Sequence, residues 1–249
     1  MELIYSIIDK RLRDKSFFNK ILRVDHSKSY FVTFLNPFSY NVFLNKPELI
    51  GEFNAFFADG ALLVTVHNLF NKDKIDRLSF DFSSIATDVL EYSENNNLSI
   101  SFIGATEEEL QGTLVNIKKL YSKLNIVYTR NGYFNNKEDY KECFNSLKDT
   151  EIDILIIGMG SPYQEEFAIK VKNKCINIPL VLTCGGFLTQ TSIKADYYYP
   201  WIKKLGLRWL QRAIMHRHVR DRLIKDYPIF IVKYIWYHIK KDLRNETVK

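Results

Sequence analysis

The stretch Asp153-Ile-Leu-Ile-Ile-Gly-Met-Gly160 decides the fold class, because it is a near-continuous apolar run that ends in glycines. A short run without polar alternation is typical of a strand buried on both faces of a parallel sheet. Pro179-Leu-Val-Leu-Thr-Cys-Gly-Gly186 repeats the pattern. Ligands gather beyond the carboxyl ends of the strands in such sheets, so these glycines mark the expected binding site.

Further strands are expected earlier in the chain. Residues 30–35 form an apolar run that ends at Asn36-Pro37, and residues 53–66 hold another that is interrupted by Ala58-Asp59-Gly60. Residues 99–104 and 125–132 also run into glycine, with a helical stretch over residues 107–124 between them. Strands that alternate with helices predict an α/β fold, with a Rossmann-like parallel sheet covered on both faces.

Length and composition favour one main domain. A chain of 249 residues with 46% hydrophobic content can bury one substantial core and carry a smaller appendage. We expect an α/β core over residues 1–200 and a helical appendage over residues 201–249. Cys143, Cys175 and Cys184 have neither paired spacing nor an even count, which argues against a disulfide framework and fits a reducing cytoplasm. No signal peptide is expected at the start of the chain.

Positive charge gathers in the appendage. Residues 201–249 contain 13 Lys and Arg against four Asp and Glu, in a chain of formal net charge +6. Such a basic tail indicates an anionic partner: substrate phosphates, a nucleic acid or acidic lipid. We expect two basic helices there, over residues 205–225 and 228–243, with Pro228 at the first position of the second.

The apolar segment of the appendage, residues 227–239, is shorter than the roughly 20 apolar residues that a spanning helix needs. Its aromatic residues stand beside Lys225, Lys240, Lys241 and Arg244. This pattern is typical of a helix that lies in the headgroup region of an anionic membrane. The alternative is a helix that docks on the protein body or on a second subunit.

Glycines and a helix start coincide at residues 156–166. Gly158 and Gly160 allow a backbone turn to approach a ligand, and a helix that begins near Pro162 directs free N–H groups at a phosphate. Tyr163 occupies the place of the third glycine of GxGxxG, so the dinucleotide fingerprint is absent and a purely structural turn is an alternative. Gln164 offers an amide to a sugar or a base.

Three further groups of charged side chains bear on the chemistry. Glu165 and Glu166 are neighbours in a helix and point apart, which disfavours the carboxylate pair of a glycosidase. His216 and His218 diverge on a helix and have no acidic partners, so no metal site is expected. Guanidinium groups match diphosphate oxygens, although a solvated helix face explains at least two of those in the tail. These arginines are Arg208, Arg212, Arg217, Arg220 and Arg222.

Seven short motifs follow one another in the order of a known family. They are Thr33-Phe-Leu-Asn-Pro37, Ala58-Asp-Gly60, Ser101-Phe-Ile-Gly104, Asn131-Gly-Tyr-Phe134, Ile157-Gly-Met-Gly-Ser-Pro-Tyr-Gln-Glu165, Gly185-Gly-Phe187 and Gly206-Leu-Arg-Trp-Leu-Gln-Arg212. Each is weak alone, but seven in family order are not expected by chance. From about residue 30 to residue 227, the chain resembles the WecG/TagA/CpsF glycosyltransferase family.

The resemblance implies an enzyme that transfers a sugar from a UDP-sugar, with inversion and without a metal or cofactor. The implied acceptor is linked to undecaprenyl diphosphate and serves the synthesis of cell-surface polysaccharide, such as teichoic acid, O-antigen, capsule or exopolysaccharide. A peripheral position on the cytoplasmic face of the bacterial inner membrane is also implied. A nucleic acid partner is not expected, and a homo-oligomer stays open.

The resemblance also assigns roles to residues. The family's base falls on Asp59, because inverting transfer needs a carboxylate to deprotonate the acceptor hydroxyl, although an Asp-Gly pair is also a common turn. The first-strand threonine falls on Thr33. Arginines that close the site match Arg212 and Arg222, with Arg220 as a third candidate. Residues expected to line the substrate site are Asn36, Gly60, Gly104, Gly158, Gly160, Ser161, Pro162, Gln164, Glu165, Gly185 and Gly186.

Three segments depart from the family pattern: residues 62–64, 187–192 and 194–201. These changes leave transferase chemistry in place but argue against assuming the family's usual N-acetylmannosamine donor. Three alternatives follow from the sequence. They are a nicotinamide-dependent oxidoreductase on the same sheet, a nucleic-acid-binding protein, and a nucleotide-sugar-binding relative that has lost activity.

Overall fold

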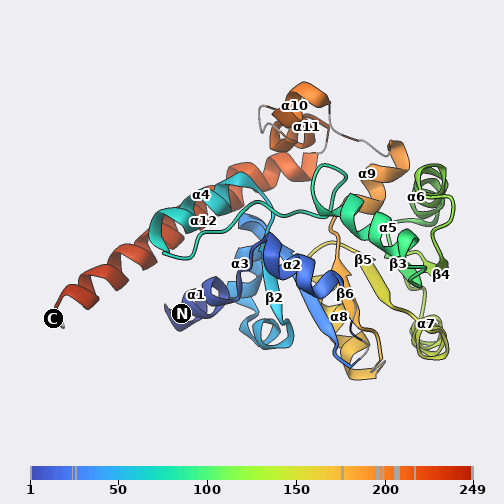
Figure 1. Cartoon of the computed structure of the whole chain (residues 1–249). Helices are drawn as coiled ribbons and strands as arrows, with labels where there is room; N and C mark the ends of the chain where they lie inside the picture. Colours follow the sequence, from blue (N-terminus) through green and yellow to red (C-terminus); the bar gives the residue numbers. More distant parts are fainter. Residues whose placement is uncertain are drawn as a thin grey trace.

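A sheet of six parallel strands forms the centre of the computed structural model, which describes residues 2–23, 25, 27–174, 177–194, 197, 199–204, 208–215 and 217–247. The strand order is β2-β1-β6-β5-β3-β4 (Figure 1). The strands are β1 Tyr30–Leu35, β2 Ala55–Ala58, β3 Ile100–Gly104, β4 Ile126–Arg130, β5 Ile154–Gly158 and β6 Leu180–Thr183. Each strand lies within the segment that predicted it, so the parallel α/β sheet is confirmed.

Helices contribute to a buried core on each face of the sheet. One core includes residues of α1 Glu2–Arg11, α3 Pro37–Asn45, the 3-10 helix η1 Pro47–Glu52, α4 Ala61–Phe70, α7 Lys137–Asp149, α8 Tyr163–Lys174 and α12 Arg217–Thr247. The other includes residues of α2 Lys15–Leu22, α5 Ile85–Asn95, α6 Glu107–Leu120 and α9 Phe187–Ile193. The short helices α10 Pro200–Lys204 and α11 Arg208–Met215 precede α12.

The apolar strands are buried because both of their faces meet these cores. Along β5, Leu155 and Ile157 belong to one core, and Ile154 and Ile156 belong to the other. All four side chains are fully buried. The lack of polar alternation in the sequence therefore has the predicted cause.

The carboxyl ends of β3 and β5 approach each other closely at two glycines. Gly104 pairs with Gly158 in the parallel ladder. A Cβ on Gly104 would lie 2.1 Å from the carbonyl oxygen of Gly158, and the φ of Gly104 is +144°. Only glycine meets both conditions, so this contact fixes the edge of the sheet from which the following loops leave.

Three predicted helices were wrong in their extent. The helix expected over residues 205–225 is divided between α11, which ends at Met215, and α12, which begins at Arg217. The helix expected over residues 107–124 ends at Leu120, and Leu124 turns into the core. No helix break precedes Pro228, which lies inside the continuous helix α12. The buried rings of Phe230 and Tyr234 pack on the body just beyond this proline, and this packing outweighs the roughly 3 kcal/mol that an interior proline costs a helix. The predicted start at residues 205–207 lies outside the described residues.

Within the described part of the chain, no helix combines the length and apolarity needed to cross a bilayer. The helix α12 lies along α3 and α4 and then continues beyond the body towards the end of the chain (Figure 1). The helix α12 is therefore in direct contact with helices that pack on the sheet.

Substitution of Gly104 by alanine tests the close approach of β3 and β5. We expect Gly104→Ala to lower the free energy of unfolding by about 3 kcal/mol, because the new Cβ overlaps backbone and the φ is unfavourable. Urea denaturation followed by circular dichroism measures this. Gly51→Ala is the matched control, since nothing lies within 4 Å of a Cβ there. Equal stability of the two variants would contradict the contact.

Candidate active site

A cavity of about 1110 Å³ opens at the carboxyl ends of the strands, where the glycines predicted it. Loops that follow all six strands line it, together with one residue of α12. Nine of the residues predicted for the site line this cavity. They are Asn36, Asp59, Gly158, Gly160, Ser161, Gln164, Gly185, Gly186 and Arg222.

Asp59 lies in this cavity because of the strand that precedes it. Its backbone N–H donates to the carbonyl of Leu35 at 2.8 Å, which extends the pairing of β2 with β1 by one residue. The carboxyl group is 25% exposed and therefore accessible from the cavity. Asp59 therefore lines the same cavity as the glycine loops.

Arg77 is a site residue that the sequence did not reveal. Its guanidinium Nη2 lies 3.6 Å from Asp59 Oδ1 and 2.8 Å from Asp81 Oδ2. The N–H of Leu78 donates to the carbonyl of Ala58 at 2.8 Å, so this loop runs alongside the end of β2. The contact depends on that backbone bond, and no local spacing in the sequence signals it.

Asp81 holds Arg77 in place from the cavity wall. Burial would raise the pKa of the Asp81 carboxyl, but the charge of Arg77 and hydrogen bonds from Ser79 and Ser83 lower it below its usual value. The hydroxyls of Ser79 and Ser83 donate to the carboxylate at 2.6 and 2.5 Å. Asp81 is therefore ionised near neutral pH and orients the cation beside Asp59.

Backbone geometry prepares the glycine loops for a ligand. Gly160 and Gly185 have φ values of +72° and +55°, which favour glycine. The Ser161–Pro162 peptide bond is cis, and α8 begins at the next residue. Ser161, Tyr163 and Gln164 line the cavity, so the positive dipole end of α8 faces it, an arrangement that suits phosphate.

Gln164 ties the two glycine loops together. Its Oε1 accepts a hydrogen bond from the N–H of Gly185 at 3.0 Å, and its Nε2 donates to Glu165 Oε1 at 2.8 Å. Its side chain still lines the cavity but is almost fully buried. The amide therefore fixes the shape of the floor as well as facing the ligand space.

Thr33 and Glu165 are fully buried and are not among the described residues that line the cavity. Glu165 Oε1 accepts hydrogen bonds from the hydroxyls of Thr33 and Ser161, each at 2.9 Å, in addition to the bond from Gln164. Burial raises the pKa of Glu165, and these hydrogen bonds oppose the rise. The network joins β1 to the start of α8.

Other predicted site residues shape loops or cap helices. Gly60 has a φ of +109° and precedes α4, and Gly104 holds the approach of β3 to β5. Arg220 donates to the carbonyls of Ala213 and Ile214 at 3.0 and 3.1 Å, which caps α11. The side chain of Arg212 lies outside the described residues. Gly60, Gly104, Pro162 and Arg220 are not among the described residues that line the cavity.

Among the described arginines of residues 201–249, Arg222 lines the cavity. Its guanidinium lies 3.7 Å from the centre of the Phe38 ring, at the start of α3. A guanidinium stacked on an aromatic face is held in position by the ring. In the described parts of the chain, no three His, Cys, Asp or Glu side chains gather as metal ligands do.

Comparison with known proteins identifies the family. The model of the WecG/TagA/CpsF glycosyl transferase family matches residues 6–244. The chain belongs to this family. The match favours a transferase over the oxidoreductase alternative.

Two relatives illustrate the range of the family. A Shigella boydii protein, UDP-Gal:alpha-D-GlcNAc-diphosphoundecaprenol beta-1,4-galactosyltransferase, is 42% identical over 84% of this chain and 87% of its own length. A Staphylococcus aureus protein, N-acetylglucosaminyldiphosphoundecaprenol N-acetyl-beta-D-mannosaminyltransferase, is 25% identical over 75% of this chain and 70% of its own length. Both relatives are named for a lipid diphosphate acceptor, and they differ in the sugar.

The buried network under the cavity floor predicts unequal roles for two neighbouring glutamates. We expect Glu165→Ala to lower the free energy of unfolding by about 3 kcal/mol, because two buried donors, Thr33 and Gln164, and the partly buried Ser161 lose their acceptor. Glu166→Ala is the matched control and should change it by at most about 1 kcal/mol, since Glu166 forms a partly exposed ion pair with Lys46. Thermal and urea denaturation would show the difference, and a larger effect at Glu166 would refute the assignment.

Proposed function

We propose that this protein transfers galactose from UDP-galactose, with inversion at C1, to the 4-hydroxyl of an N-acetylglucosamine linked to undecaprenyl diphosphate. One observation carries the proposal: a single cavity joins the Asp59 carboxylate to the glycine-rich start of α8. The first group suits deprotonation of a hydroxyl, and the second suits a diphosphate. The similarity to the Shigella boydii galactosyltransferase supports this donor and acceptor.

In this mechanism, Asp59 takes the proton of the acceptor hydroxyl. The acceptor oxygen attacks C1 of galactose on the face opposite UDP, and the bond between C1 and the β-phosphate oxygen breaks. UDP leaves with the bonding electron pair, and its charge is stabilised by Arg222 and the positive dipole end of α8. Arg212 and Arg220 of the same appendage are further candidates for the diphosphate.

Arg77 orients the proposed base without blocking it. Its shorter contact is with Asp81, at 2.8 Å, and its contact with Asp59 is 3.6 Å. When Asp59 takes up a proton, Arg77 keeps its partner in Asp81, so protonation of the base does not strand a buried cation. Thr33 and Glu165 act by holding the floor of the donor site, through the bonds to Ser161 and Gln164.

The cavity wall at α9 supports a donor other than N-acetylmannosamine. The segment 187–192, which departs from the family pattern, coincides with this helix. Thr189 and Gln190 of α9 line the cavity. Phe187, also of α9, packs on Phe80, another cavity residue, with ring centres 4.9 Å apart. The departure therefore lies within reach of a bound sugar.

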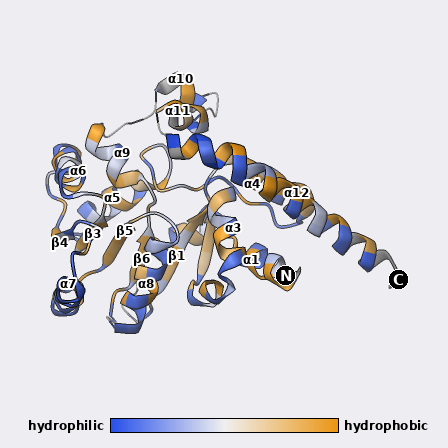
Figure 2. Ribbon diagram, turned by 180° about the vertical axis from the view of Figure 1, so that it is seen from behind, coloured by the Kyte–Doolittle hydropathy of each residue, from blue (hydrophilic) through white to orange (hydrophobic). Residues whose placement is uncertain are grey.

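We further propose that the outer face of α12 seats the protein on the anionic cytoplasmic face of the inner membrane. Ile229, Val232, Trp236, Ile239 and Leu243 are exposed and spaced by three or four residues, so they share one side of the helix. Hydrophobic and hydrophilic segments alternate along α12 (Figure 2). Apolar and basic residues on one exposed helix favour an anionic interface, where a lipid-linked acceptor lies.

The division into a core over residues 1–200 and an appendage over residues 201–249 belongs to this proposal, and a homo-oligomer is compatible with it.

Removal of the proposed base tests the reaction. We expect Asp59→Asn to keep the fold and to lower the rate of galactose transfer from UDP-galactose to an N-acetylglucosaminyl-diphosphate lipid by about 10²–10⁴-fold, because the amide takes up no proton. Product formation measured with radiolabelled UDP-galactose tests this. Asp25→Asn, which changes an exposed carboxylate, should leave the rate unaltered. Wild-type transfer by the Asp59 variant would remove the proposed base.

Substitutions on the outer face of α12 test the membrane contact. We expect Val232→Glu with Trp236→Glu to weaken binding to phosphatidylglycerol vesicles at least about tenfold, because two apolar side chains lose their burial in lipid. Flotation with the vesicles measures binding. Val115→Glu with Leu120→Glu, two exposed apolar residues of α6, is the matched control and should bind normally. Unchanged flotation of the α12 variant would refute this surface.

A further inference from the structure

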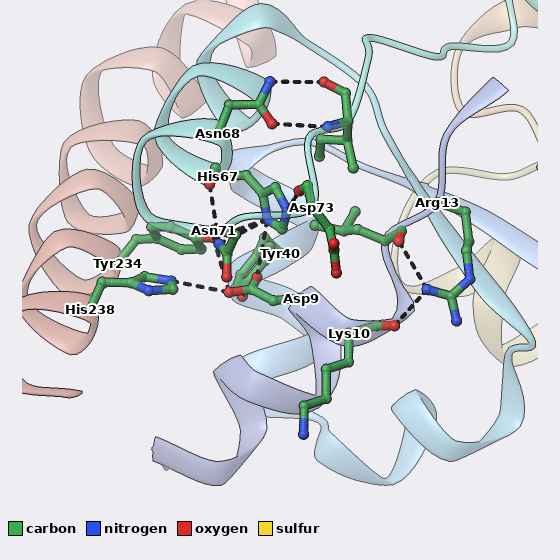
Figure 3. A network of polar contacts seen from close by, with 12 residues as sticks. Asp9, Lys10, Arg13, Tyr40, His67, Asn68, Asn71, Asp73, Tyr234 and His238 are labelled. Carbon is green, nitrogen blue, oxygen red and sulfur yellow. Dashed lines mark hydrogen bonds and ion pairs between the residues drawn. The ribbon is translucent and has the colours of Figure 1, made fainter. Parts of the chain in front are cut away.

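A buried carboxylate outside the cavity connects four helices (Figure 3). Asp9 of α1 accepts a hydrogen bond from the hydroxyl of Tyr40 at 3.0 Å through Oδ1. Its Oδ2 lies 3.0 Å from the hydroxyl of Tyr234 and 3.0 Å from Nε2 of His238. Nδ1 of His67 lies 3.8 Å from Oδ1. Asp9 thus contacts α3, α4 and α12 at one point.

The network holds Asp9 in its charged form. Burial would raise the pKa of Asp9, but the hydrogen bonds and charges of His238 and His67 outweigh burial and lower the pKa to about 2. The side chain of Asp9 is 6% exposed, and those of His67 and His238 are 3% and 2% exposed. A carboxylate in this position is difficult to replace, because its loss leaves several buried donors without an acceptor.

Each of the three helices that meet at Asp9 has a candidate active-site residue at or near its start. The side chain of Asn36, a cavity residue, caps α3 by accepting from the N–H of Ser39 at 3.1 Å. Asp59 and Gly60 directly precede α4. Arg222 lies in the second turn of α12. Asp9 therefore contacts three helices whose starts shape one cavity.

The docked side of α12 is continuous between Arg222 and Asp9. Below the contact of Arg222 with Phe38, the carbonyl of Asp226 accepts from Asn41 at 3.2 Å. One turn further, the Phe230 ring lies 5.2 Å from that of Tyr40. Tyr234 and His238 follow at the same spacing of four residues. Residues four apart are neighbours on a helix surface, so these contacts form a continuous row that winds around α12 from Arg222 to the Asp9 site.

We propose that Asp9 is a positioning residue for the transfer reaction. Asp9 sets the placement of α12 and thereby brings Arg222 to the leaving diphosphate. The inference rests on the proposed roles of Arg222 and Asp59. It predicts that Asp9, which lies outside the cavity, controls the rate of transfer through Arg222, which lines it.

A double-mutant cycle tests the inference. We expect Asp9→Asn to lower kcat for transfer from UDP-galactose by about tenfold to a hundredfold, the range that a misplacement of about 1 Å produces in an active site. In an Arg222→Ala background, the same substitution should produce no further loss, because the group that Asp9 positions is gone. Equal losses from Asp9→Asn in both backgrounds would overturn the proposal.

A milder variant keeps the test informative where Asp9→Asn folds poorly. Tyr234→Phe removes one hydroxyl from the network and retains the ring, so we expect a smaller loss of kcat with the same dependence on Arg222. Hydrogen–deuterium exchange should rise along α12 in both variants. Normal exchange in α12 combined with a normal kcat in the Tyr234 variant would overturn the proposal.

Asp153→Asn is the matched control. Asp153 accepts from the N–H of Ser99 at 2.7 Å at the amino ends of the strands, opposite the cavity. We expect it to lower stability while kcat per folded enzyme and exchange in α12 stay unaltered. A loss of kcat in this control equal to that of Asp9→Asn would also overturn the proposal. Failure of the proposed function is distinguishable, because it appears as wild-type transfer by Asp59→Asn.

Discussion

Parallel pairing of β1 with β2 is the constraint on which the active site depends. The ladder aligns Leu35 with Ala58, so Asn36 and Asp59 leave the sheet side by side at the same edge. The bond from the N–H of Asp59 to the carbonyl of Leu35 continues this alignment beyond the strands. Because β5 and β6 run in the same direction, their glycine loops open at that edge too. The cavity is thus a consequence of strand direction and register.

Three buried carboxylates then stabilise the parts that surround the cavity, each with a different set of donors. Asp81 pairs with a cation, Arg77, whereas Glu165 receives three hydrogen bonds from neutral side chains. Asp9 is surrounded by histidines and tyrosines. Buried charge is tolerated only when such partners are present, so each carboxylate requires its neighbours to keep one arrangement. Asp81 lies in the cavity wall, Glu165 lies beneath the cavity floor, and Asp9 contacts α12.

The sequence predicted the elements whose signals are local and missed those that depend on contacts across the chain. Strands such as β5 were evident from continuous apolar runs, and Asp59 from an Asp-Gly turn in a family motif. Arg77 was missed because its approach to Asp59 depends on a backbone bond from a loop. The continuity of α12 through Pro228 was missed because packing against the body overrides local preference. The contact of Asp9 with His238 joins residues 229 positions apart, a separation that no periodic pattern reports.

The two faces of α12 give the appendage a mechanical meaning. Arg222, Phe230 and Tyr234 lie on the side that docks against the body, while Val232 and Trp236 are exposed on another side. A helix transmits displacement along its axis because its backbone hydrogen bonds are local and continuous. A surface that binds the exposed side therefore also acts on the helix that carries Arg222. Under the proposed membrane contact, the orientation of the protein on the surface and the position of Arg222 would depend on the same helix.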